Sequence, residues 1–139
     1  MSTEPTGGRP QIERIDAAAY TIPTDGPESD GTFRWGATTL VLVQASAGGV
    51  TGLGYTYAHA AAVPLILETL APVVQGLDAF AVPAAWIAML RQVRNLGRPG
   101  LASTAISAVD VALWDLEARL LGLPLCDLLG RVRDGVPVY

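Results

Sequence analysis

Three carboxylates lie close together in the stretch AVDVALWDLEARL: Asp110, Asp115 and Glu117. Grouped acidic side chains are typical ligands of a divalent cation, so a metal site is the first chemistry to consider. The surrounding apolar residues recur at helical spacing, which separates Asp110 from Glu117 by about 10 Å along the axis. Asp115 points roughly 140° away from Asp110. The three cannot converge on one cation, and we expect Asp115 to pair with Arg119 and Asp110 to bond nearby backbone or an arginine.

Other groups capable of acid–base or nucleophilic chemistry are few. His59 is the only histidine, Cys126 is the only cysteine, and all nine basic residues are arginines. The absence of lysine excludes Schiff-base chemistry and a P-loop, and the Cys and His counts exclude an internal disulfide and the usual zinc sites. We expect Cys126 to be a buried, unreactive thiol. His59 fits a helix start, with ligand contact as the alternative, and a self-sufficient enzyme is disfavoured because only His59 could act as a base.

The segment GGVTGLG has the glycine spacing G-x-x-G-x-G and joins strand to strand. It therefore lacks the helix N-terminus that a dinucleotide-binding loop needs. Glycines of a turn and bulge are the main interpretation. The alternative is that Gly52 and Gly54 let the backbone approach a ligand beside Tyr55 and Tyr57. Trp35 lies at the end of a polar stretch, where packing alone does not explain a tryptophan.

The elements that would position these residues indicate an α+β fold, with a three-stranded antiparallel meander followed by a bundle of three to four helices. A Gly-Gly turn joins the second and third strands, a long polar loop follows the first, and Pro72 ends or interrupts the first helix. The expected strands span 12–22, 38–46 and 50–57, the loop 24–32, and the helices 60–70, 82–96 and 100–121, with a short last turn in LCDLLG.

Composition sets broader limits on the function. The 139 residues fit one domain, and a net charge of −4 without a basic cluster argues against a nucleic-acid or anionic-membrane partner. Residues 1–11 are expected to form a flexible tail, no apolar run predicts a membrane span, and a single cysteine fits the cytoplasm. Apolar residues make up 50% of the chain, and helix 100–121 is apolar nearly all round. We therefore expect this chain to pack against further protein.

The strings IERIDAAAYTIP, TTLVLVQASAGGVTGLGYTY and AISAVDVALWDLEARLLGLPLCDLLG resemble the N-terminal capping domain of the enolase superfamily. The closest branch is that of mandelate racemase and muconate lactonizing enzyme, and the resemblance covers residues 12–139. It implies a partner (β/α) barrel that supplies the Mg²⁺ ligands and the bases that abstract a proton α to a substrate carboxylate. The barrel is missing from this chain and is expected in the same or a neighbouring reading frame.

The resemblance also implies a role for the domain. Its two loops, at 23–35 and 54–59 here, close over the barrel mouth and set substrate specificity, which makes Trp35, Tyr55, Tyr57 and His59 the candidate substrate-binding residues. The chain itself is expected to hold no catalytic residue and no metal. The complete enzyme would be a homo-oligomeric racemase or acid-sugar dehydratase acting on a small carboxylate. The alternative is a stand-alone module that binds a small acid or a protein.

Overall fold

The computed structural model describes residues 8–138, so most of the expected tail lies outside the described residues. Its sheet contains three antiparallel strands in the order β1-β2-β3, which confirms the expected α+β meander. β-branched residues dominate the centre of β2, where alternate side chains (Val41, Val43) are fully buried. The strands are β1 (Arg14–Ser29), β2 (Arg34–Ala47) and β3 (Val50–Tyr57).

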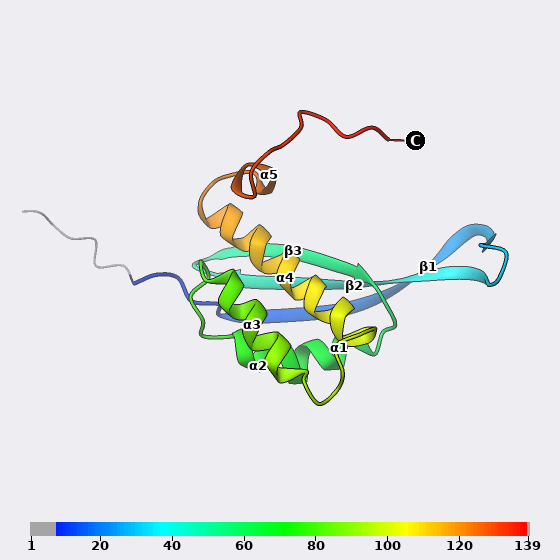
Figure 1. Cartoon of the computed structure of the whole chain (residues 1–139), viewed down its shortest axis with the longest axis horizontal. Helices are drawn as coiled ribbons and strands as arrows, with labels where there is room; N and C mark the ends of the chain where they lie inside the picture. The colour runs from blue at the N-terminus through cyan, green and yellow to red at the C-terminus, as the bar shows by residue number, and fades with distance from the viewer. Residues whose placement is uncertain (1–7, 139) are drawn as a thin grey trace, which may run out of the picture.

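The helices gather against one face of this sheet, and the β1–β2 hairpin extends well beyond the end of β3 (Figure 1). One hydrophobic core fills the space between the two layers. No helix among residues 8–138 is long and apolar enough to cross a membrane. The helices are α1 (Ala62–Leu65), the π-helical turn η1 (Ile66–Leu70), α2 (Ala71–Val74), α3 (Val82–Gln92), α4 (Leu101–Leu120) and α5 (Leu125–Leu128).

The expectation of a loop at 24–32 is wrong for most of that stretch, because β1 continues to Ser29. Pairing passes from Pro23 opposite Ala37 to Glu28 opposite Trp35, so residues 24–27 bulge opposite a single residue of β2. Proline is tolerated in β1 because β1 is an edge strand. The polar, glycine-rich sequence therefore forms the bulge and tip of a long hairpin.

Asp30 closes the tip of this hairpin. Its Oδ1 accepts hydrogen bonds from the backbone N–H of Thr32 (3.0 Å), the Thr32 hydroxyl (2.8 Å) and the backbone N–H of Phe33 (2.9 Å). These bonds, the Thr32 backbone bond first, hold the pKa of the Asp30 carboxyl below its usual range. Three bonds to one carboxylate fix the tight connection between the two strands.

Pro72 interrupts the first helix without ending it. The chain stays helical from α1 through α2, and the Ala71 N–H bonds back to Ile66 O, five residues earlier. A π-helical turn directly before the proline lets the helix continue without the bond that the proline nitrogen cannot make. α3 ends at Gln92 rather than 96, and Gly97 adopts a positive φ of 86° shortly after it.

α4 packs directly on β3 through the two glycines of that strand. A Cβ at Gly52 would overlap the backbone of Ala112 and Leu116, and a Cβ at Gly54 would overlap the backbone of Ala108 and Ala112. The interpretation of Gly52 and Gly54 as turn and bulge residues is wrong, because both lie inside β3 in regular register with β2. Of the alternative, the close approach is present, but it is to a helix rather than to a ligand. This contact places α4 directly over β3, in the body of the domain from which the hairpin extends.

Candidate functional site

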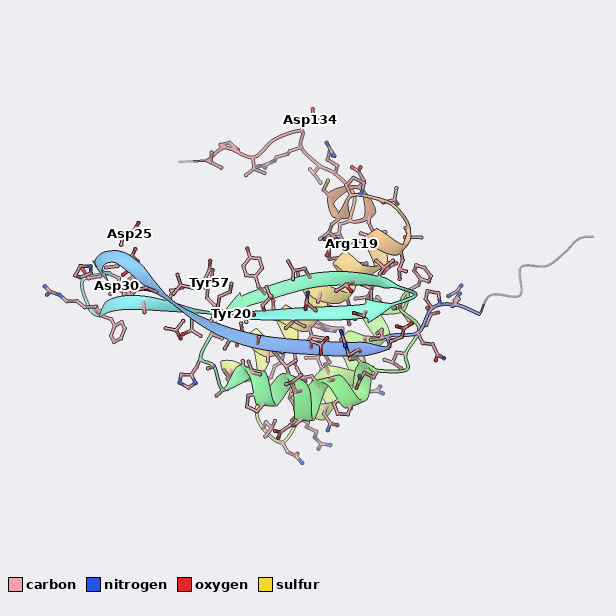
Figure 2. The ribbon with its side chains drawn as sticks, turned by 180° about the vertical axis from the view of Figure 1, so that it is seen from behind. Tyr20, Asp25, Asp30, Tyr57, Arg119 and Asp134 are labelled. Carbon is pink, nitrogen blue, oxygen red and sulfur yellow. The ribbon has the colours of Figure 1, made fainter. Side chains whose placement is uncertain are left out.

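A depression of about 380 Å³ lies where the hairpin leaves the body of the sheet. Figure 2 shows Asp25 and Asp30 at the far tip of the hairpin and Tyr57 back toward the body. The depression is bounded by the base of the hairpin, by the end of β3 and by the loop that leads into α1. Its lining consists of Phe33, Trp35, Ala37, Thr38, Thr39, Tyr57, Ala58 and His59.

Trp35 is fixed by contacts within the hairpin. Its indole Nε1 donates a 2.8 Å hydrogen bond to Glu28 Oε2, the residue opposite it on β1. The ring of Phe33 stacks on the indole, with centroids 6.3 Å apart and planes 17° from parallel. The carboxylate at the indole edge and the ring on its face together orient Trp35 without a ligand.

His59 lies between β3 and α1, as expected for a residue at a helix start. Its Nδ1 accepts a 3.1 Å hydrogen bond from the Ala61 N–H, and its carbonyl accepts a 2.9 Å bond from the Ala62 N–H. A ring nitrogen that accepts a hydrogen bond carries no proton, so this bond places the ring proton on Nε2. The imidazole thus helps to begin α1 while its Nε2–H remains a donor at the rim of the depression.

The structure brings three of the four candidate residues together, because Trp35, Tyr57 and His59 line the same depression. Tyr55 is outside the lining and meets Tyr57 edge-on, with ring centroids 6.1 Å apart. Aromatic faces, a phenol and an imidazole N–H can stack on C–H groups and hydrogen-bond to hydroxyls. The arrangement is therefore suited to binding and orienting a small polar molecule.

Several neighbours of these residues were not foreseen from the sequence. Phe33 could have been found, because it lies two residues before Trp35 and thus on the same side of an extended strand. Thr38 and Thr39 lie in an apolar run that gave no sign of lining a surface. Glu28 was hidden because its stretch was expected to be a loop, in which it has no strand partner.

The acidic residues of α4 separate as expected. Asp115 Oδ2 accepts from Arg119 Nε (2.7 Å), which confirms the predicted pair, and also from the Leu53 N–H (2.8 Å) on β3. The expectation for Asp110 is wrong, because no residue in 8–138 forms a hydrogen bond or ion pair with its carboxylate. Desolvation in an apolar groove raises its pKa. The helix turns this carboxylate away from the arginine and backbone donors that surround Asp115.

Residues 8–138 contain no group of three His, Cys, Asp or Glu side chains that could hold a metal ion. The carboxylates of α4 do not fit magnesium, because Asp115 is already committed to two donors and Asp110 lies on another face. The expectation that Cys126 is buried is wrong, because the residue is exposed. The four-residue helix α5 is too short to bury the thiol, and its Sγ lies 3.4 Å from an Arg131 nitrogen.

The family model for the mandelate racemase / muconate lactonizing enzyme N-terminal domain matches residues 28–130. The match spans most of the chain, including α4 and both sides of the depression. The class of protein that fold and sequence define is therefore the enolase-like capping domain. This chain belongs to the mandelate racemase / muconate lactonizing enzyme family, of which it represents the N-terminal domain.

Known members show how the chain relates to longer proteins. It is 38% identical over 136 residues to a 3,6-anhydro-α-L-galactonate cycloisomerase from Streptomyces coelicolor, covering 92% of this chain and 37% of that protein. It is similar to a mandelate racemase/muconate lactonizing enzyme-like protein from Rubrobacter xylanophilus, with 54% identity, a TM-score of 0.91, and coverage of 94% and 36%. It is also similar to L-talarate dehydratase from Polaromonas sp. JS666 complexed with Mg and L-glucarate, with 31% identity, a TM-score of 0.79, and coverage of 91% and 37%. The chain thus spans a little over a third of each.

Proposed function

We propose that this chain is the substrate-capping and specificity domain of a magnesium-dependent enzyme of the mandelate racemase type. The reaction is proton abstraction α to a carboxylate, in a racemase or an acid-sugar dehydratase. The groups that perform it lie in a barrel domain encoded in the same or a neighbouring reading frame. The chain alone is not catalytically competent, because residues 8–138 offer no metal set and His59 is their only imidazole.

The depression at the base of the hairpin carries this proposal. Aromatic rings and hydroxyls from the hairpin, from β3 and from the following loop converge there. Two of the similar proteins are named for reactions on sugar acids, which present hydroxyls and C–H faces to such a surface. Magnesium, when bound in the barrel, stabilises the negative charge formed on the substrate. Trp35, Tyr57 and His59 orient the rest of the substrate and exclude water.

A chimera tests the proposal. Residues 12–139 replace the corresponding segment of the Streptomyces coelicolor cycloisomerase, and α-proton exchange in D₂O with Mg²⁺ is followed by NMR for mandelate and a panel of sugar acids. We expect exchange with the chimera and none with the isolated chain. Exchange by the isolated chain contradicts the proposal. A folded, magnesium-binding chimera that exchanges none of these acids also contradicts it.

The same substitution at two neighbouring tyrosines tests whether the substrate contacts the depression. In the chimera, Tyr57→Phe should change KM or kcat for the preferred acid by about tenfold, as expected for losing one hydrogen bond worth ~1.4 kcal/mol. Tyr55→Phe removes the same hydroxyl from a ring outside the lining and should leave both constants nearly unchanged. Equal effects of the two substitutions would place the substrate elsewhere.

A further inference from the structure

A second concave surface, here called the tryptophan groove, lies between α3 and α4 and shares no residue with the depression. Its volume is about 340 Å³. Pro83, Trp86 and Ile87 line it from α3, and Asp110 and Trp114 line it from α4. Asp110 and Trp114 are four residues apart on one helix, so both project from the same face. The groove thus consists of apolar walls with one carboxylate among them.

The carboxylate of Asp110 lacks a counter-charge. It is half-buried, and no residue in 8–138 donates a hydrogen bond to it or pairs with it. An ionised carboxylate in apolar surroundings is unfavourable unless a donor or cation compensates it. Burial accordingly raises its pKa. A positively charged group in the groove would remove this cost.

The walls of the groove suit a guanidinium in particular. The Arg98 guanidinium already lies 5.9 Å from the ring centroid of Trp86, so this indole attracts such a group in the free domain. Guanidinium stacks on indole faces and forms paired hydrogen bonds with a carboxylate, whereas an ammonium does not stack in this way. Trp86, Trp114 and Asp110 provide both kinds of contact.

Uncompensated negative charge continues along the same face of α4. Glu117 lies three residues beyond Trp114, and its Oε2 is buried without a hydrogen-bond partner within residues 8–138. Desolvation raises the pKa of Glu117, and the neighbouring Asp78 carboxylate raises it further. A partner of this face is therefore cationic rather than anionic.

We propose that the tryptophan groove is a docking site for a protein segment that inserts an arginine side chain between Trp86 and Trp114, with its guanidinium on Asp110. The segment is apolar on either side of the arginine, since Pro83 and Ile87 form the rest of the wall. This interaction surface is separate from the proposed capping function. It would hold whatever substrate the complete enzyme takes.

The test uses the isolated chain and a pair of peptides. Acetyl-Leu-Arg-Leu-amide is compared with the same peptide containing citrulline, which has the shape of arginine without its charge. The reporters are the indole N–H signals of the three tryptophans, assigned through Trp86→Phe and Trp114→Phe. We expect saturable shifts of the Trp86 and Trp114 signals at millimolar arginine peptide, with Trp35 unmoved. The citrulline peptide should bind at least tenfold more weakly.

Asp110→Asn should abolish the preference for arginine over citrulline, whereas Asp25→Asn, in the hairpin, should preserve it. Circular dichroism verifies that both variants are folded. Equal binding of the two peptides, an Asp110→Asn variant that keeps the preference, or no shift up to the solubility limit each overturns the proposal. Shifts that depend on protein concentration and not on peptide indicate a second copy of the chain as occupant, and they also overturn it.

Discussion

Glu28 and Trp35 face each other across the hairpin, and the indole N–H of Trp35 donates a 2.8 Å hydrogen bond to the Glu28 carboxylate. A carboxylate acceptor gives a shorter and stronger bond than a neutral one. The bond lies beside the depression and fixes a side chain that lines it. Glu28 is thus a positioning residue for Trp35.

We predict that Glu28→Ala in the chimera lowers kcat/KM about tenfold, or ~1.4 kcal/mol, because Trp35 loses its fixed orientation. The emission of Trp35, measured in a Trp86→Phe/Trp114→Phe background, should shift at the same time. The free energy of unfolding should change by no more than about 0.5 kcal/mol, because the pair is at the surface. Glu68→Ala, in the exposed part of η1, serves as the control. If the indole emission moves while the kinetics stay unchanged, Trp35 does not contact substrate.

The contact between β3 and α4 gives a prediction about stability. Gly54→Ala should lower the free energy of unfolding by about 2–3 kcal/mol, because the added methyl group overlaps the Ala108 carbonyl and forces the helix away from the strand. Gly36→Ala introduces the same methyl group in β2, where nothing lies within 4 Å. Its effect should stay within about 0.5 kcal/mol. Urea unfolding of the three proteins measures both values, and similar stabilities would contradict the close packing seen here.

Asp115 protects the outer edge of the sheet, since β3 is an edge strand and the Leu53 N–H donates to this carboxylate. Asp115→Ala leaves that N–H without its acceptor and should cost about 1–2 kcal/mol. Hydrogen exchange at the Leu53 amide should accelerate accordingly. Asp127→Ala removes the other i,i+4 pair, with Arg131, which is exposed on both sides. That variant should lose at most about 0.5 kcal/mol, and an equal loss would mean that Asp115 acts only through Arg119.

The sequence patterns predicted the regular parts of the fold well. The short run TTLVLVQAS, rich in β-branched residues and followed by Gly48-Gly49, predicts β2. The longer segment around Val109 predicts α4, because Ala105, Val109 and Ala112 share one face at helical spacing. The outer part of the β1–β2 hairpin, beyond Ile22 and before Thr38, was missed because it is polar and contains Gly26 and Pro27. The bulge and the Asp30 turn that stabilise it depend on pairing with β2, which local sequence does not encode.

The residues of the candidate site likewise divide into those that the sequence indicates and those whose role depends on pairing between strands. Trp35, Tyr57 and His59 were identified through the family resemblance, and their meeting in one depression follows from the length of the hairpin. Glu28 could not be identified, because its role depends on a cross-strand register. A close approach at Gly52 and Gly54 was only the alternative to a turn and bulge, because local sequence does not show that α4 packs on these two residues.

The pH dependence of stability follows from two opposed pairs of carboxyls. Burial raises the pKa of Asp110 and Glu117 above their usual 3.8 and 4.5, so the native state holds protons that the unfolded state has lost. The free energy of unfolding should therefore rise as pH falls through their folded pKa values. Hydrogen bonds lower the pKa of Asp30 and Asp78 instead, from the Thr32 and Phe80 backbone N–H groups respectively, and their contribution is lost as pH falls below about 3.8.

Asp110→Asn separates these contributions. The substitution removes the ionised form, and solvent screens the exposed half of the side chain, so the stabilisation at pH 7 should be only about 0.5 kcal/mol and should vanish as pH approaches 4. Urea unfolding of both proteins from pH 7.5 to 4 checks the crossover, and Asp25→Asn, at an exposed position in the hairpin, serves as the control for the substitution itself. A constant difference between Asp110→Asn and the parent at every pH would show that the Asp110 carboxyl titrates alike in the folded and unfolded states. In that event the groove does not desolvate its charge.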